Sequence, residues 1–254
     1  MAVANSDHLC PPSAMSLTRR DLITASAMLL VASSARAKGI TDASGRTIKV
    51  PEDVGRVFPA GPPAAILLYT LAPDLLLGWP RANRADECAL LLPDICTRPE
   101  VGRLTGRGNT ASLESMLELK PDLILDVGST APTFASLATR VQEQTGIPYA
   151  LLDGRFEATA STYRLLGALT HRDAEPLATY TENTLATILA RINRIPGNER
   201  PRVYYARGPR GLETGLGGSI NVETIEFLGA TSPASVTVGL PRCQSNRCLF
   251  GTLK

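Results

Sequence analysis

The spacing of apolar and polar residues predicts a series of short elements near the start of the chain. In "ITDASGRTIKVPEDVGRVFPAG", β-branched residues alternate on either side of Gly45, which predicts a hairpin with its turn at that glycine. Val57 and Phe58 predict a brief strand that Pro59 ends. The stretch "PPAAILLYTLAP" predicts a helix with proline at its start, and "DLLLGWP" predicts a strand that closes at Gly78.

A regular order of helices and strands follows a long loop. Residues 80–108 are rich in arginine, proline and glycine, which predicts a surface loop. In "NTASLESMLELKPDLILDVG", Ser112 can cap a helix that Pro121 ends, and "LILDV" predicts a buried strand with one polar member. The stretch "TFASLATRVQEQTG" predicts an amphipathic helix that Gly146 ends, before a strand in "IPYALLDG". This alternation predicts an α/β lobe with a parallel sheet over residues 38–157.

Helical signals dominate the next part of the chain, residues 158–199. The stretch "TASTYRLLGALTH" predicts one helix, and "AEPLATYTENTLATILARINRI" predicts a second helix or a continuation of the first. Such helices would form either a surface cover or a strut between two lobes. The second stretch carries one apolar stripe at spacings of three and four, made by Leu177, Thr181, Leu185, Ile188, Ile192 and Ile195.

A second α/β lobe begins after these helices. The stretch "PRVYYARG" predicts a strand, on which Tyr204 and Tyr205 would face opposite sides, and "SINVETIEFLGA" predicts a helix. From about residue 232 the helical period disappears, and only a weak strand is predicted, at Val236–Val238. Because one strand and one helix cannot bury both faces of a sheet, residues 200–254 predict an incomplete second lobe with an aberrant tail.

The first 37 residues have the pattern of an export signal. Arg19 and Arg20 precede an apolar stretch, Leu22–Ala35, which is too short to span a bilayer, and a cleavage-like "ARA" ends at Ala37. The paired arginines are typical of twin-arginine export, although an ordinary secretory signal remains an alternative. We therefore predict a periplasmic protein whose signal, residues 1–37, is cleaved near Ala37.

Charge and cysteine content narrow the class of protein. The chain has 26 basic and 24 acidic residues, so no strong field favours nucleic acid as a partner. In an oxidising compartment the pairs Cys88/Cys96 and Cys243/Cys248 are possible, but their spacing does not exclude free thiols. A zinc site is less favoured because no second close pair of Cys or His accompanies them.

Histidine is too scarce for the common hydrolytic sites. The chain has two histidines, and His8 precedes the signal, which leaves His171 alone in the mature chain. This argues against a Ser-His-Asp triad and against a histidine-rich metal site. The "GLGGS" segment lacks both the GxGxxG pattern and the lysine of a phosphate-binding loop. We therefore predict no catalytic residue, no metal and no cofactor.

Several of these segments together resemble a known family. From residue 40 to about 230, "DASGRTIKVPEDVGRV", "NTASLESMLELKPDLIL", the long helices and "GLETGLGGSINVETIEFLGA" are similar to periplasmic solute-binding proteins of ABC importers for ferric siderophores, heme or cobalamin. The resemblance implies two α/β lobes joined by a rigid helix, with the ligand held in the cleft between them. It also implies a monomer that captures a small chelate and delivers it to a membrane permease, without bond chemistry.

Candidate ligand contacts follow from residue chemistry at predicted loops and strand ends. Arginine forks suit carboxylate, catecholate or phosphate oxygens, and aromatic rings suit a macrocycle or chelate. Ligands of open parallel sheets bind at the carboxyl ends of the strands, so small polar residues there can line the wall of the cleft. Each arginine has the alternative of a solvated loop charge, and the tryptophan has the alternative of core packing. The candidates are Tyr69, Trp79, Arg103, Arg107, Gly128, Ser129, Tyr205 and Arg207, with Arg210 as a further loop arginine.

The start of the predicted helix in "SLESMLE" carries a different candidate. In the family that the chain resembles, a surface glutamate at this place docks on arginines of the permease, which implies that role for Glu114. A partner glutamate would lie in the segment after residue 232, where the sequence departs from the family. The alternative role of Glu114 is a carboxylate placed favourably at a helix N-terminus.

Two other functions remain alternatives at this stage. An exported α/β hydrolase or transferase would share the predicted fold, but the missing pair of nucleophile and histidine disfavours it. A non-functional truncated product would explain the aberrant tail, and it would show no cooperative melting.

Overall fold

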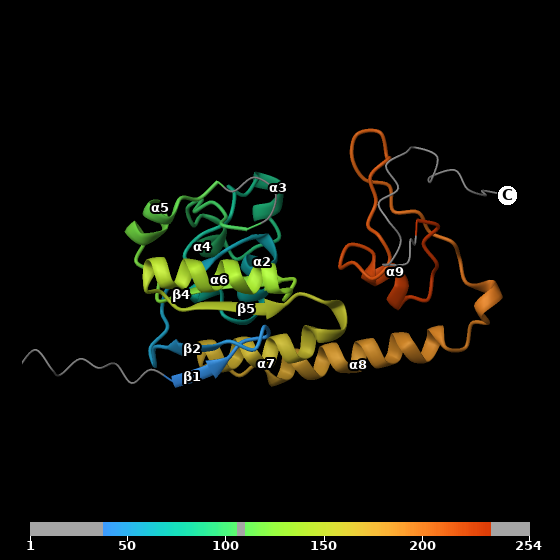
Figure 1. Cartoon of the computed structure of the whole chain (residues 1–254), viewed down its shortest axis with the longest axis horizontal. Coiled ribbons are helices and arrows are strands. Elements are labelled where there is room, and N and C mark those ends of the chain that lie inside the picture. Colours follow the sequence, from blue (N-terminus) through green and yellow to red (C-terminus); the bar gives the residue numbers. More distant parts are fainter. Residues whose placement is uncertain (1–37, 106–109, 235–254) are drawn as a thin grey trace, which may run out of the picture. The chain divides into compact units, whose positions relative to one another are not determined.

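The computed structural model describes residues 38–105 and 110–234 (Figure 1). The predicted signal, residues 1–37, lies outside the described residues. The same holds for Arg107, for the weak strand Val236–Val238 and for the cysteines Cys243 and Cys248. Among the described residues, no helix combines the length and the apolar content that crossing a bilayer requires.

The chain opens on the predicted hairpin. Strands β1 (Lys38–Thr41) and β2 (Thr47–Val50) pair antiparallel, and Gly45 takes a φ of 86° in the turn. The carboxylate of Asp42 accepts hydrogen bonds from the backbone N–H groups of Ser44 and Arg46, which fixes the turn from inside. The hairpin prediction is confirmed.

Three parallel strands form the sheet of the first lobe, in the order β3, β4, β5. They are β3 (Val57–Pro59), β4 (Leu123–Gly128) and β5 (Tyr149–Asp153), and their buried residues are almost all apolar. Strand β4 lies in the middle, with Phe58 opposite Ile124 on one side and Leu151 opposite Asp126 on the other. The predicted parallel sheet of an α/β lobe is confirmed.

Helices cover both faces of this sheet. Successive residues of β4 point to opposite sides, so its apolar residues need a cover on each face. On one face, Leu123 and Leu125 join a core with the hairpin, with α2 (Pro62–Leu71) and with α7 (Thr159–Thr170). On the other face, Ile124 joins a second core with α5 (Leu113–Glu118) and α6 (Pro132–Thr145). The sheet is therefore buried on both sides, as a continuous apolar strand requires.

Local signals set the ends of these helices as the sequence predicts. The Oγ of Ser112 accepts a hydrogen bond from the backbone N–H of Ser115 at 3.0 Å, which caps α5. Gly146 ends α6 in the left-handed region, at a φ of 72°. Both end signals are confirmed.

The expected strand in "DLLLGWP" is wrong. Pro73–Leu75 form a short 3-10 helix, η1, and the stretch makes two isolated parallel bridges, from Leu76 to Val57 and from Trp79 to Glu100. Gly78 then packs so closely on the next segment that a Cβ there would lie 2.4 Å from the carbonyl oxygen of Pro99. The apolar run is buried by these tertiary contacts rather than by a strand ladder, which its composition alone does not distinguish.

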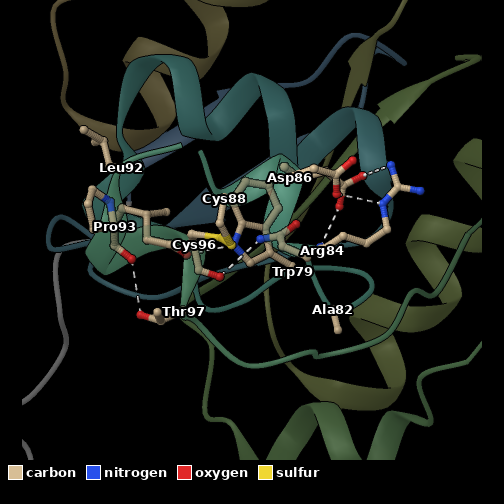
Figure 2. Close-up of a disulfide and its surroundings, with 12 residues drawn as sticks. Trp79, Ala82, Arg84, Asp86, Cys88, Leu92, Pro93, Cys96 and Thr97 are labelled. Atoms are coloured by element: carbon tan, nitrogen blue, oxygen red, sulfur yellow. Dashed lines mark hydrogen bonds and ion pairs between the residues drawn. A yellow bond between two sulfur atoms is a disulfide. The ribbon is translucent and has the colours of Figure 1, made fainter. Parts of the chain in front are cut away.

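Residues 80–105 hold more structure than the surface loop predicted over residues 80–108. They contain two short helices, α3 (Ala85–Cys88) and α4 (Pro93–Cys96), joined by a disulfide between Cys88 and Cys96 (Figure 2). One of the two pairings that the sequence allows is therefore formed. Ile95, Cys96 and Leu104 are buried, so this segment belongs partly to the core.

Two aromatic residues anchor the disulfide segment. The Nε1 of Trp79 donates to the carbonyl oxygen of Ile95 at 2.8 Å, as the dashed line in Figure 2 marks. The hydroxyl of Tyr69 accepts from the backbone N–H of Leu92 at 2.9 Å, and its ring centroid lies 5.8 Å from that of Trp79. The two rings thus connect α2 with the disulfide segment.

The long helical region forms two helices rather than one. Helix α7 ends at His171, which takes a left-handed φ of 53°, and α8 (Glu175–Ile192) runs back beside it (Figure 1). Arg164 of α7 reaches across to Glu175 and Glu182 of α8. The expected apolar stripe is covered only in part, since Ile192 is buried and Leu185 half-buried while 44% of Ile195, just beyond α8, remains exposed.

The segment after α8 has fewer regular elements than predicted. It holds the short η3 (Gly197–Glu199), α9 (Glu223–Phe227) and a parallel bridge between Arg202 and Thr231. The expected strand in "PRVYYARG" is therefore reduced to isolated bridges. Tyr204 and Tyr205 are both exposed, by 39% and 43%, so their expected alternation is wrong because no ladder imposes it.

The disulfide should stabilise the first lobe measurably. The double variant Cys88→Ala/Cys96→Ala removes a cross-link across eight positions, and we expect the free energy of unfolding to fall by about 2 to 3 kcal/mol. Urea unfolding measures this change, and emission from Trp79, the only tryptophan, reports on the anchored segment. We expect that emission to shift to the red as water reaches a looser segment.

Thr97→Ala is the control for this experiment, because Thr97 is an exposed neighbour of Cys96. It should leave both the unfolding curve and the emission unchanged. An unfolding midpoint of the double variant equal to that of the wild type would show that the cross-link contributes nothing.

Candidate functional site

The carboxyl ends of β3, β4 and β5 meet at one edge of the sheet, where open parallel sheets bind their ligands. A cavity of about 410 Å³ opens at this edge. Its walls come from the start of α2, the end of β4, the loop after β5 and the start of α7. The lining residues are Pro62, Pro63, Ile66, Leu67, Val127, Asp153, Gly154, Arg155, Thr159, Thr162 and Tyr163.

A second, smaller cavity of about 180 Å³ adjoins the first and shares Pro62, Pro63 and Val127 with it. Its remaining lining residues come from the loops that follow β3 and β4, from α6, and from a loop that packs over β4. They are Gly61, Thr105, Asp126, Gly128, Ser129, Phe134 and Leu151. The smaller cavity therefore extends the larger one across the end of the central strand.

A buried carboxylate lies in the wall of the smaller cavity. Asp126 is only 6% exposed, and its Oδ2 accepts a hydrogen bond from the hydroxyl of Tyr149 at 2.9 Å. Its Oδ1 lies 3.1 Å from the hydroxyl of Thr105. Burial raises the pKa of Asp126, because a charged carboxylate loses water there, and these hydrogen bonds only partly oppose the rise. Burial and the neighbouring carboxylate likewise raise the pKa of Tyr149.

The larger cavity contains one ion pair. The guanidinium of Arg155 contacts the carboxylate of Asp153 at 2.5 Å. Partial burial raises the pKa of Asp153, but the hydrogen bonds from Arg155 outweigh this effect and hold that pKa below its usual value. The positive charge of Arg155 is thus already matched within the site.

Two of the predicted ligand contacts, Gly128 and Ser129, line the smaller cavity. They lie at the end of β4 because a parallel strand directs its last residues to this edge. Gly128 also faces Gly154 closely, since a Cβ on Gly154 would lie 2.8 Å from the Cα of Gly128. The paired glycines keep the two strand ends together at the cavity.

The two aromatic candidates of the first lobe lie elsewhere. Trp79 is 4% exposed and bonded to the disulfide segment, which matches its alternative role in core packing. It also lines a third cavity of about 310 Å³, together with Leu90, and this cavity shares Pro62 and Ile66 with the larger one. Tyr69 is half-buried, with its hydroxyl engaged by Leu92.

The arginine candidates also lie outside the linings of the two cavities, as far as the described residues show. Arg103 is half-buried, and its backbone N–H donates to Thr110. Arg207 and Tyr205 lie together, with the guanidinium carbon 5.8 Å from the centre of the ring. Arg207 also donates to the side-chain oxygen of Asn221 at 3.1 Å.

Glu114 lies in the first turn of α5 and is exposed. The Ser112 cap fixes the start of this helix, so the carboxylate is held at the surface. This placement fits both of its expected roles, at the helix N-terminus and toward a partner.

Sequence reasoning did not identify Asp126 or the pair Asp153–Arg155 as site residues. Asp126 is the one charged residue within the apolar strand β4, and this signal by itself indicates only an exception in the burial pattern. Within the described ranges, no three side chains of His, Cys, Asp or Glu gather as metal ligands.

Comparison with known proteins identifies the fold. No family model and no curated protein matches the chain. Among solved structures, an ABC transporter solute-binding protein from Sulfurospirillum deleyianum is 23% identical, with a TM-score of 0.69 over 80% of this chain and 64% of its own. The molybdate-binding protein MolA of Haemophilus influenzae is 17% identical, with a TM-score of 0.60 over 79% and 67%.

A third solved structure, the heme-binding protein HmuT, is 21% identical, with a TM-score of 0.51 over 80% of this chain and 64% of its own. The chain thus spans less than two thirds of the Sulfurospirillum and HmuT proteins. At such identities the likeness concerns the fold, and by their names all three of these proteins are binding proteins. Over about 80% of its length, the chain has the α/β fold of the periplasmic solute-binding proteins of ABC transporters.

Proposed function

We propose that the chain is the extracytoplasmic solute-binding component of an ABC importer, which captures an iron chelate, heme or corrinoid and delivers it to a membrane permease. The observation that carries the proposal is the pair of adjoining cavities at the carboxyl edge of the parallel sheet. Their combined walls supply shape and a few polar groups, which is what reversible capture needs.

The walls of the larger cavity favour a broad, partly apolar cargo. Pro62, Ile66 and Val127 line it, and the one cation among its described lining residues, Arg155, is paired with Asp153. A bare oxyanion needs several donors to replace its water, whereas a macrocycle or chelate can bury an apolar face. The matched proteins bind molybdate or heme by their names, so their shared fold does not choose the cargo.

An exported hydrolase or transferase remains the alternative function. His171, the one histidine among the described residues, is exposed at the end of α7 rather than at the cavities. A serine or threonine nucleophile at the cavities would therefore have no histidine base nearby within that part of the chain. This arrangement favours binding over catalysis.

The remaining parts of the proposal follow from the domain organisation. Residues 158–199 would connect the first lobe to a second lobe that begins at residue 200, and the cargo would lie between the two. The protein would act as a monomer in the periplasm after cleavage near Ala37. Arg103, Arg207 and Tyr205 would reach the cargo from loops, and Glu114 would dock on the permease.

A thermal-shift panel tests the proposed cargo. Ferric siderophores, heme and cobalamin are added to the mature chain, and one class should raise the melting midpoint. At a concentration of 100 times the dissociation constant, binding adds about 2.7 kcal/mol of stability, or roughly 5 to 10 °C for a chain of this size. Metal-free siderophores and ferric citrate serve as controls.

A cooperative melt that no member of the panel shifts would remove these cargo classes. Turnover of generic esters or phosphates by the purified protein would favour the enzyme instead. The absence of any cooperative melt would indicate the non-functional product.

The docking role of Glu114 is tested separately. Glu114→Ala should leave the affinity for the cargo unchanged, because the residue lies on the surface of α5. It should lower the affinity for the permease in proteoliposomes by about tenfold, the scale expected when one partner of a charge pair is lost.

Glu118→Ala is the matched control, since Glu118 is an exposed glutamate on the same helix. Equal docking by the two variants would contradict the role of Glu114. Melting curves of both variants account for the small loss of helix N-terminal charge in Glu114→Ala.

A further inference from the structure

The wall of the smaller cavity contains a buried carboxylate whose known partners in the described ranges are all neutral. Asp126 lies near the end of β4, buried among the apolar residues of the sheet, and it lines this cavity. The groups that act on its carboxylate there are the hydroxyls of Tyr149 and Thr105 and the backbone N–H of Val127. Two arginines of this lobe pair with other carboxylates, Arg46 with Asp42 and Arg155 with Asp153.

The hydrogen bonds of Asp126 leave room for another donor. An ionised carboxylate offers about four acceptor positions. Tyr149 fills one of them, and the backbone N–H of Val127 also donates to the carboxylate. Thr105 divides its single hydroxyl hydrogen between Oδ1 of Asp126 and the carbonyl oxygen of Ala60, at 3.1 and 3.3 Å. All three donors are neutral. A buried carboxylate held only by neutral donors is costly unless a cation completes the site.

The rest of the cavity is poor in donors. Helix α2 begins with Pro62 and Pro63, and α6 begins with Pro132, so these first positions lack the N–H groups that usually bind anions. The hydroxyl of Ser129 accepts from the backbone N–H of Ala131 and keeps a single O–H to donate. Leu151 and Phe134 make the remaining wall apolar. An anion would find few partners here, whereas a cationic donor would find the carboxylate.

The volume sets the size of the group. A cavity of about 180 Å³ holds roughly six heavy atoms, taking about 30 Å³ for each as in liquid water. A whole chelate or macrocycle does not fit, but a short alkyl arm ending in an ammonium does. The smaller cavity shares Pro62, Pro63 and Val127 with the larger one. Such an arm can therefore belong to a cargo whose main body is bound in the larger cavity.

We propose that the smaller cavity is a subsite for a primary ammonium group on a short alkyl arm. The carboxylate of Asp126 binds the ammonium, and the hydroxyls of Thr105 and Tyr149 hold that carboxylate in place through hydrogen bonds. The assignment of that arm to the cargo rests on the proposed function. The subsite itself rests on the cavity and its carboxylate, so it can be tested without the cargo.

A purely structural role for Asp126 makes a different prediction. The residue would then only connect the loop at Thr105 with Tyr149 of β5, and small ammonium compounds would leave it unaffected. The deciding experiment therefore measures binding rather than stability alone.

Propylammonium chloride is the probe, added to the mature chain at constant ionic strength. We expect a saturable rise of the melting midpoint and a fall in the pKa of Asp126, followed by carbon-13 NMR of its carboxyl group. Sodium propionate and 1-propanol match the probe in size without its charge, and neither should produce these effects.

Asp126→Asn should weaken the binding of propylammonium at least tenfold. Glu143→Gln, which removes an exposed carboxylate from α6, should bind it like the wild type. Equal responses to propylammonium and propionate, or unchanged affinity in Asp126→Asn, would overturn the subsite. If Asp126→Asn fails to fold, the test uses the wild-type protein. An Asp126 pKa that stays the same at saturating propylammonium would then overturn the subsite.

The two proposals can fail separately. Chelates that bind while propylammonium does not would remove only the subsite. Propylammonium that binds through Asp126 while no chelate does would retain the subsite and contradict the proposed cargo.

Discussion

The parallel pairing of β4 with β3 on one side and β5 on the other is the constraint on which the first lobe depends. Because β4 is central and buried on both faces, each face needs its own cover, which α2 and α7 supply on one side and α5 and α6 on the other. Parallel strands must be joined by crossover connections, so all three strands end at the same edge. The cavities lie at that edge for this reason.

The same constraint explains why the site is mostly apolar. Residues that leave a buried strand are still close to the core, and Val127 of β4 borders both cavities. Asp126 is tolerated so deep because Tyr149 on the neighbouring strand and Thr105 on a loop both reach its carboxylate. Arg155, which lines the larger cavity, is neutralised by Asp153. The first lobe thus offers shape, apolar surface and acceptors more than positive charge.

Much of the first lobe could be predicted because its signals are local. Gly45 sets a turn, Ser112 starts α5 and Gly146 ends α6, each through the conformation of one residue. The segment from residue 73 to 105 could not be predicted, since the packing of Gly78 on Pro99 and the Cys88–Cys96 bond depend on distant partners. From residue 200 to 234, strand-like composition forms isolated bridges, because no strand of these described residues pairs with it.

The site was predictable only in part, for the same reason. Gly128 and Ser129 follow from a general rule about where parallel strands end. Whether Trp79 meets a ligand or the core depends on the position of the Ile95 carbonyl, which no sequence pattern reveals. Asp126 was visible in the sequence, but its meaning required the cavity beside it.

Hydrogen–deuterium exchange with and without a bound chelate tests most directly whether this edge of the sheet is the binding surface. The account predicts slower exchange on binding in residues 124–131 and 153–160, which form the cavity walls at the ends of β4 and β5. It predicts no change in the hairpin, residues 38–50. Protection that appears in the hairpin while both cavity segments exchange as before would contradict the account.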